Sequence, residues 1–133
     1  MKIFLDTNIF LDLLLNRKEC DSAKEIFNAI QNEIFEAYVA DITLLNIDYI
    51  AKKQTTDIRK FLSYISDNFN ILGASNKDFE NALKIDNSDL DDNIQYLLAK
   101  KVSCDLIVSN DRSFLQEDIK VIQSDAFVTH YVL

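Results

Sequence analysis

The chain has 133 residues, of which 48% are hydrophobic, and it carries a formal net charge of −8. This length and apolar content suffice for one domain with a substantial core but not for two, and they exclude a disordered chain. The negative charge argues against general affinity for nucleic acids, because phosphate contacts need Lys and Arg. It does not exclude a nuclease, since acids gathered at a metal site would account for part of the excess.

The apolar runs are too short to cross a membrane, and the N-terminal run is interrupted by Asp6, so we expect neither a spanning helix nor a signal peptide. Cys20 stands at a predicted helix start and Cys104 beside an apolar strand. Both positions favour reduced thiols, which are typical of a cytoplasmic protein. The single Gly and the absence of Pro indicate a mostly helical chain with short connections.

Short apolar strands alternate with amphipathic helices along the chain. In chain order we expect a strand over 2–5, a helix over 8–15, a helix opened by Asp21 and Ser22, a strand over 35–40, a helix with Thr43 as its N-cap, a helix after 55–57, a strand over 70–72, helices over 77–85 and 91–102, strands over 106–108 and 118–122, and a C-terminal helix from Ser124. Short, continuously apolar strands separated by helices indicate a parallel sheet covered on both faces. The prediction is a single α/β domain over 1–133, a three-layer α/β/α sandwich with a central parallel sheet of about five strands.

Acidic residues follow two of the predicted strands. Asp6 ends the first apolar run and is followed at once by Thr7 and Asn8, while the strand over 106–108 runs through Ser109 and Asn110 into Asp111. Open α/β sheets bind their ligands at the carboxyl ends of their strands. A collected set of carboxylates is the ligand chemistry of Mg²⁺ or Mn²⁺.

Two further motifs stand at predicted helix starts. One is the segment 43–46, which begins with Thr43 and ends with Asn46. The other is 89–92, where three carboxylates meet the positive end of a helix. If Asp92 lies in the first turn of that helix, it projects from the same sheet edge as the other acids.

Together these motifs resemble those of the PIN-domain family, metal-dependent ribonucleases that include the toxins of many bacterial toxin–antitoxin modules. The family's motifs are a strand ending in D-T-N, a T-x-x-E helix start, an E-D or D-D pair opening a later helix, and a strand ending in T-x-D or T-x-N. The first, third and fourth are matched here by Phe4–Asn8, by Asp91-Asp92 followed by 93–96, and by Ile107–Asp111 with Ser for Thr. The resemblance covers essentially the whole chain.

The resemblance implies a PIN-like fold and an Mg²⁺- or Mn²⁺-dependent endoribonuclease that hydrolyses RNA phosphodiesters. It further implies a toxin held by a small antitoxin protein, with a homodimer as an additional expectation. The catalytic residues and ligands of one or two ions would be Asp6, Asp92 and Asp111. Weaker candidates, which would orient these carboxylates or join them, are Asn8, Asn46, Asp91 and Ser109.

Two residues depart from the family pattern. Asn46 stands where the family usually places Glu, and Ser113 precedes Phe114 where many members carry a further acid. An amide oxygen at Asn46 can coordinate a cation or hold a water, but it brings no charge. We therefore expect weaker metal binding than in members that keep the Glu.

Other interpretations remain open. One is a PIN-fold protein without catalysis that binds RNA or a protein partner, which Asn46 and Ser113 support. A second is a phosphotransfer domain of haloacid-dehalogenase or receiver type, but the first needs an acid where Asn8 stands and the second an acid near Gly73. Each acid also has a structural interpretation as a helix or turn cap. The occurrence of all of them in family order at one sheet edge favours a site.

Overall fold

A computed structural model describes all residues from 1 to 133. Its elements are β1 (Lys2–Leu5), α1 (Thr7–Leu14), α2 (Cys20–Gln31), β2 (Glu36–Ala40), α3 (Asp41–Ala51), α4 (Ile58–Asn68), β3 (Asn70–Leu72), α5 (Asn76–Lys84), α6 (Leu90–Lys101), β4 (Leu106–Val108), β5 (Lys120–Ile122), α7 (Ser124–Phe127) and a π-helical turn, η1 (Val128–Val132). All five strands form one sheet in the order β3-β2-β1-β4-β5, and every neighbouring pair is parallel. The predicted three-layer α/β/α fold is confirmed.

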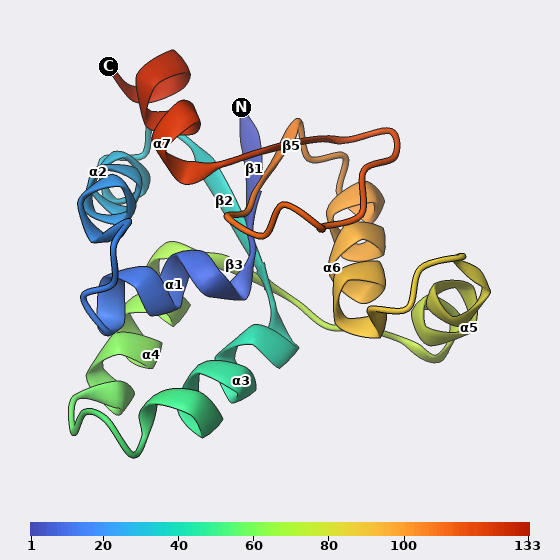
Figure 1. Cartoon of the computed structure of the whole chain (residues 1–133), viewed down its shortest axis with the longest axis horizontal. Coiled ribbons are helices and arrows are strands. Elements are labelled where there is room, and N and C mark those ends of the chain that lie inside the picture. Colours follow the sequence, from blue (N-terminus) through green and yellow to red (C-terminus); the bar gives the residue numbers. More distant parts are fainter.

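The strands are buried on both sides, and successive side chains enter two separate cores. Ile3 and Leu5 of β1 join a cluster of 23 buried residues, whereas Phe4 between them joins a second cluster of 12. Helices α1, α2, α3, α4 and α7 contribute to the first cluster, and α5 and α6 to the second. The two groups of helices lie on opposite sides of the sheet (Figure 1). This explains why the strands are continuously apolar rather than alternating.

The prediction that Thr43 caps the third helix is wrong. The helix begins at Asp41, after Ala40 in an extended conformation, and Thr43 is fully buried within its first turn. Its hydroxyl lies 3.0 Å from the hydroxyl of Thr7 in α1. Thr43 therefore links α3 to α1 instead of capping the start of α3.

The last strand is shorter than predicted. Only Lys120–Ile122 pair with β4, which itself has three residues. Asp118 is held by α6 instead, because its backbone N–H donates to the Tyr96 hydroxyl at 3.1 Å and its carboxylate accepts from Lys100 at 2.8 Å. The other predicted elements are present with ends shifted by one or two residues, as is usual for helix and strand boundaries.

None of the helices combines the length and the apolar character that a membrane crossing requires. Cys20 and Cys104 are both buried and are not bonded to one another. Burial raises the pKa of the Cys104 thiol to about 12, so this thiol is unreactive at neutral pH.

Candidate functional site

The site lies where β1 and β4 end side by side in the middle of the sheet. β2 and β3 lie on one side of β1, and β4 and β5 lie on the other side. The order of the strands along the sheet therefore changes direction between β1 and β4. Such a point is where open α/β sheets form their binding crevices. Asp6 follows β1 directly, and its backbone N–H donates to the carbonyl of Val108, the last residue of β4, at 3.0 Å. Ser109 follows β4, and its hydroxyl contacts the side chain of Asp6.

Asp6 is 5% exposed, and its carboxylate accepts four hydrogen bonds. Oδ1 accepts from the backbone N–H of Thr7 at 2.7 Å and from Nε2 of Gln95 at 2.9 Å. Oδ2 accepts from the hydroxyl of Ser109 at 2.7 Å and from Nδ2 of Asn8 at 3.0 Å. Burial raises the pKa of Asp6, while the bonds from Ser109, Gln95 and Thr7 act to lower it. These donors fix the position of Asp6 from three different elements.

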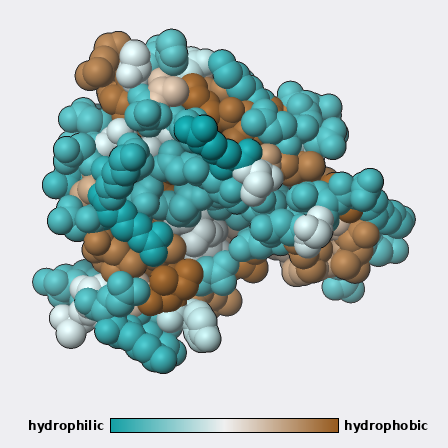
Figure 2. Space-filling view, viewed as in Figure 1, coloured by the Kyte–Doolittle hydropathy of each residue, from teal (hydrophilic) through white to brown (hydrophobic).

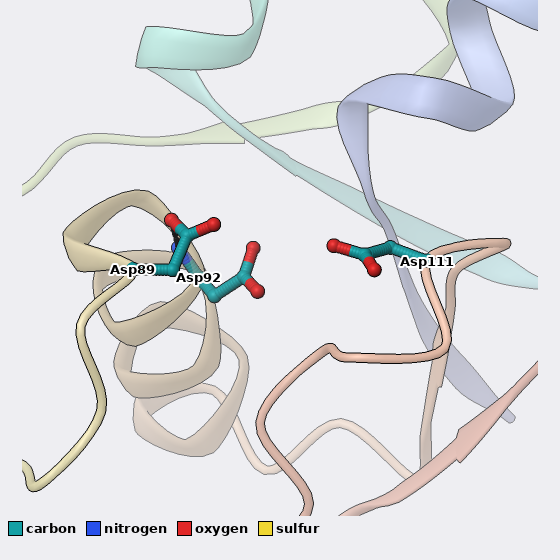
Figure 3. A group of neighbouring side chains, drawn as sticks. All are labelled: Asp89, Asp92 and Asp111. Atoms are coloured by element: carbon teal, nitrogen blue, oxygen red, sulfur yellow. Dashed lines mark hydrogen bonds between the residues drawn. The ribbon is translucent and has the colours of Figure 1, made fainter.

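A cluster of three carboxylates lies at this edge. Asp89, Asp92 and Asp111 each offer one oxygen, and these three oxygens lie within 4.8 Å of one another. Asp89 is the N-cap of α6, and its side chain accepts from the backbone N–H of Asp92 at 3.1 Å. Figure 3 shows Asp92 extending from the start of α6 toward Asp111, which reaches back from the loop after β4. The sequence prediction grouped Asp6, Asp92 and Asp111; two of these acids are in the cluster, Asp89 takes the third place, and Asp6 is not among the three.

Asp92 is the acid whose environment is least satisfied. It is 5% exposed, and its Oδ2 is buried without any hydrogen-bond partner. Burial, followed by the negative charges of Asp89, Asp6, Asp111 and Asp91, raises the pKa of Asp92 to about 7. Buried polar atoms are nearly always paired, so this oxygen indicates a missing proton, donor or cation.

Asp111 is half-buried and is held by the serine that follows it. Its Oδ1 accepts from the backbone N–H of Ser113 at 2.9 Å and from the Ser113 hydroxyl at 2.7 Å. Its own backbone N–H donates to the hydroxyl of Ser109 at 3.1 Å. Ser113 thus orients Asp111 through one carboxylate oxygen.

Asn46 contacts Asp91 rather than the three-carboxylate cluster. Its Nδ2 donates to Oδ2 of Asp91 at 3.3 Å. Asp91 is half-buried, and its pKa is raised by burial and by the charges of Asp6 and Asp89. The uncharged Asn46 of α3 therefore hydrogen-bonds to an acid of α6.

Gln95 is a site residue that the sequence interpretation missed. It is 1% exposed, and its Nε2 donates both to Asp6 and, at 3.1 Å, to Oδ1 of Asp91. Its Oε1 is buried without a partner. The available signal was helical spacing, since Gln95 lies four residues after Asp91 and three after Asp92 and so shares their face of α6.

A second missed feature is a chain of amides behind Asp6. Oδ1 of Asn8 accepts from the backbone N–H of Asn110 at 3.1 Å, and Nδ2 of Asn110 donates to the buried Asp12 at 2.8 Å. Oδ1 of Asn110 accepts from the backbone N–H of Ser124 at 2.9 Å. The chain ties α1, the loop after β4 and α7 together, so Asn8 is fixed on both its oxygen and its nitrogen.

The residues at this edge fit a divalent cation of the Mg²⁺ or Mn²⁺ type. The donors are carboxylate and amide oxygens without any sulfur or imidazole, which is the chemistry that hard cations prefer. The buried, unpaired Oδ2 of Asp92 and the mutual repulsion of the acids are what a cation would relieve. Asp89 is exposed and Asp111 is half-buried, so it is the buried Asp92 that distinguishes this cluster from a group of solvated surface acids.

Comparison with known proteins gives three findings. A family model described as a PIN domain matches residues 2–113. Ribonuclease VapC1 of Aquifex aeolicus (strain VF5) is 32% identical over 136 positions, which cover 95% of this chain and 92% of the relative. A chain in the crystal structure of VapBC2 from Rickettsia felis, bound to a DNA fragment from its promoter, superposes with a TM-score of 0.68 at 16% identity, covering 92% of this chain and 98% of that one.

Proposed function

The chain belongs to the PIN-domain family, and from this premise we propose that it is a metal-dependent endoribonuclease acting as the toxin of a toxin–antitoxin module. The relative from Aquifex, which matches almost end to end, is named a ribonuclease. The structural relative is part of a VapBC2 assembly. In this proposal residues 1–133 form one PIN-like domain.

The single observation that carries the catalytic proposal is the cluster of Asp89, Asp92 and Asp111, in which Asp92 has a buried carboxylate oxygen without a hydrogen-bond partner. In this proposal Asp92 and Asp111 hold one or two ions of Mg²⁺ or Mn²⁺ together with Asp6, and Asp89 adds a further oxygen from the helix N-cap. A bound cation of this kind lowers the pKa of a coordinated water and balances the charge that builds on a phosphate during hydrolysis.

The chain's own residues would prepare the site for that chemistry. Ser109, just after β4, and Asn8, near the start of α1, both donate hydrogen bonds to Asp6. Ser113 donates to Asp111 in the same way. Residues that hydrogen-bond to metal ligands fix the geometry of those ligands, so removing such residues weakens metal binding or activity. Without a cation the clustered negative charge would repel an RNA phosphate, so cleavage should require metal absolutely.

A small antitoxin protein is the partner that we propose, and a homodimer and a cytoplasmic location remain predictions. Apolar side chains reach the surface in separate patches, one of them over α5, on a mostly hydrophilic face (Figure 2). Phe79 and Leu83 of α5 are 41% and 71% exposed, and Leu45 and Tyr49 of α3 are 71% and 75% exposed. Such side chains are suited to protein contacts.

The alternative is a PIN-fold protein that binds RNA or protein without cleaving it. The observation that favours it is Asn46, whose amide brings no charge to the site and donates to Asp91 instead. This alternative predicts no cleavage of any RNA under any divalent cation, while partner binding continues.

Cleavage of total cellular RNA with Mg²⁺ or Mn²⁺, with mapping of the new ends, tests the proposal. We expect cleavage by the wild type, none in EDTA, and a loss of about 100-fold or more in Asp92→Asn. Asp67→Asn is the matched control, because Asp67 is exposed near the end of α4, just before β3 begins. Undiminished cleavage by Asp92→Asn, or cleavage in EDTA, would contradict the site. Absence of cleavage by a wild type that binds metal would favour the alternative.

A further inference from the structure

Gln95 places its amide nitrogen between two carboxylates. Nε2 lies 2.9 Å from Oδ1 of Asp6 and 3.1 Å from Oδ1 of Asp91. An ionised carboxylate can only accept hydrogen bonds, so the NH₂ end of the amide must face these oxygens and the orientation of the side chain is determined. Both N–H groups are then used, one to bind Asp6 after the end of β1 and the other to bind Asp91 on α6.

This orientation leaves the carbonyl end without a donor. Oε1 of Gln95 and Oδ2 of Asp92 are the two buried side-chain atoms that lack a hydrogen-bond partner. They belong to residues three apart on α6, and both are acceptors. Burying an unpaired acceptor is unfavourable, and an apolar side chain of similar length at position 95 would avoid that cost. What both atoms lack is a donor or a cation.

Support of Asp6 alone does not explain Gln95. Asp6 accepts three further hydrogen bonds, from Thr7, Asn8 and Ser109. Gln95 is the one residue that binds Asp6 and Asp91 at the same time. Its particular effect is therefore to hold the acid after β1 at a fixed distance from an acid of α6, despite their repulsion.

We propose that Gln95 is a positioning residue of the cation site, whose NH₂ group holds Asp6 against Asp91 and whose carbonyl oxygen supplies a neutral acceptor to a hydrated divalent cation beside Asp92. The inference rests on the proposed metal dependence of this site. In this role the uncharged Gln95 keeps Asp6 and Asp91 close to one another before a metal ion binds. Loss of the amide should then weaken cation binding without unfolding the protein.

Mn²⁺ affinity, measured by water-proton relaxation on the folded protein, tests this role in Gln95→Met and in the control Gln54→Met. Met keeps the length of the side chain and removes both polar ends, and Gln54 is an exposed glutamine beyond the end of α3. We expect Gln95→Met to remain folded in EDTA, with a lowered melting temperature because Asp6 and Asp91 each lose a donor, and to bind Mn²⁺ about ten-fold more weakly. Gln54→Met should be unchanged in both measurements. Equal affinity of Gln95→Met and wild type would overturn the inference.

Gln95→Glu provides a second, independent readout. It replaces the bridging NH₂ by a third carboxylate, so we expect it to melt below Gln95→Met in EDTA and to regain more stability on addition of Mn²⁺. Equal melting of the two variants in EDTA would show that position 95 does not lie between ionised acids, and the inference would fail. Failure of the wild type to bind Mn²⁺ would overturn the proposed metal dependence as well, whereas wild-type binding with unchanged Gln95→Met overturns only the role of Gln95.

Discussion

The hydroxyl of Ser109 donates a hydrogen bond of 2.7 Å to Oδ2 of Asp6, although 103 positions separate the two residues in the sequence. The bond joins the carboxyl ends of β1 and β4, which are neighbours in the sheet. The same hydroxyl accepts from the backbone N–H of Asp111. Ser109 therefore connects two of the acids that the sequence nominates as metal ligands.

Replacing Ser109 by Ala should loosen this connection. We expect Ser109→Ala to lower the free energy of unfolding by about 1–3 kcal/mol, because a buried carboxylate loses a donor, and to reduce RNA cleavage. Urea denaturation and the cleavage assay measure the two effects. Ser66→Ala, at an exposed position of α4, is the control and should be neutral. A loss in Ser109→Ala no larger than that of the control would show that the bond contributes nothing.

Neutralising Asp6 and neutralising Asp92 should have opposite effects on stability without metal. Asp6 accepts four hydrogen bonds, so the NH₂ of Asp6→Asn would face donors and destabilise the fold by roughly 1–3 kcal/mol. At pH 8, where Asp92 is ionised, Asp92→Asn removes a charge from among other acids and should stabilise the fold by a similar amount. Urea denaturation in EDTA checks both signs. Shifts in the same direction would refute the contrast between a satisfied and an unsatisfied acid.

The raised pKa of Asp92 predicts a pH dependence of stability. The folded-state pKa is about 7 against an ordinary value of 3.8, so the folded state holds this proton more tightly than the unfolded state. The free energy of unfolding should therefore fall as pH rises from about 4 to about 7 and then level off. The full shift corresponds to about 4 kcal/mol, and solvent screening reduces the expected contribution of this group to on the order of 2 kcal/mol. The measurement is urea denaturation in EDTA at pH 5 and pH 8.

The matched control for this pH effect is Asp92→Asn. The variant keeps every other titrating group, so its loss of stability between the two pH values should be smaller than that of the wild type. Identical losses in both proteins would mean that Asp92 titrates normally. Mn²⁺ added at pH 8 should restore stability to the wild type.

Asn46→Glu tests the effect of the missing charge. A carboxylate at this position would face Asp91, so we expect lower stability in EDTA and Mn²⁺ binding tighter by about ten-fold, since opposite charges attract more strongly in a partly buried site. Asn46→Ala separates added charge from loss of the amide. Unchanged Mn²⁺ affinity in Asn46→Glu would place position 46 outside the reach of the cation.

Local patterns in the sequence predicted most of the fold. Strands such as 2–5 and 106–108 are short apolar runs that end on polar residues, and their burial on both faces follows from that pattern. The structural interpretations of Asp6 and Asp111 also hold, because Asp6 accepts from the N–H of Thr7 and Asp111 from that of Ser113. A carboxylate has two oxygens, so it can cap a helix or turn through one hydrogen bond and still face a site.

Side-chain contacts between distant elements could not be predicted in the same way. The placement of Thr43 depends on its contact with Thr7 across two helices, and that of Gln95 depends on how α6 is rotated against β1. Asp89 was visible as a helix-start acid, but its approach to Asp111 depends on the path of the loop after β4. These distances depend on how the helices and loops pack against one another, and the spacing of residues within one helix does not predict that packing.

The most direct test of the account is a titration of the purified protein with Mn²⁺, following the EPR signal of the free ion, for wild type, Asp92→Asn and Asp67→Asn. The account predicts that wild type and Asp67→Asn bind Mn²⁺ alike and that Asp92→Asn loses the binding. Absence of binding by the wild type at millimolar Mn²⁺, or equal binding by all three proteins, would contradict a cation site built around Asp92.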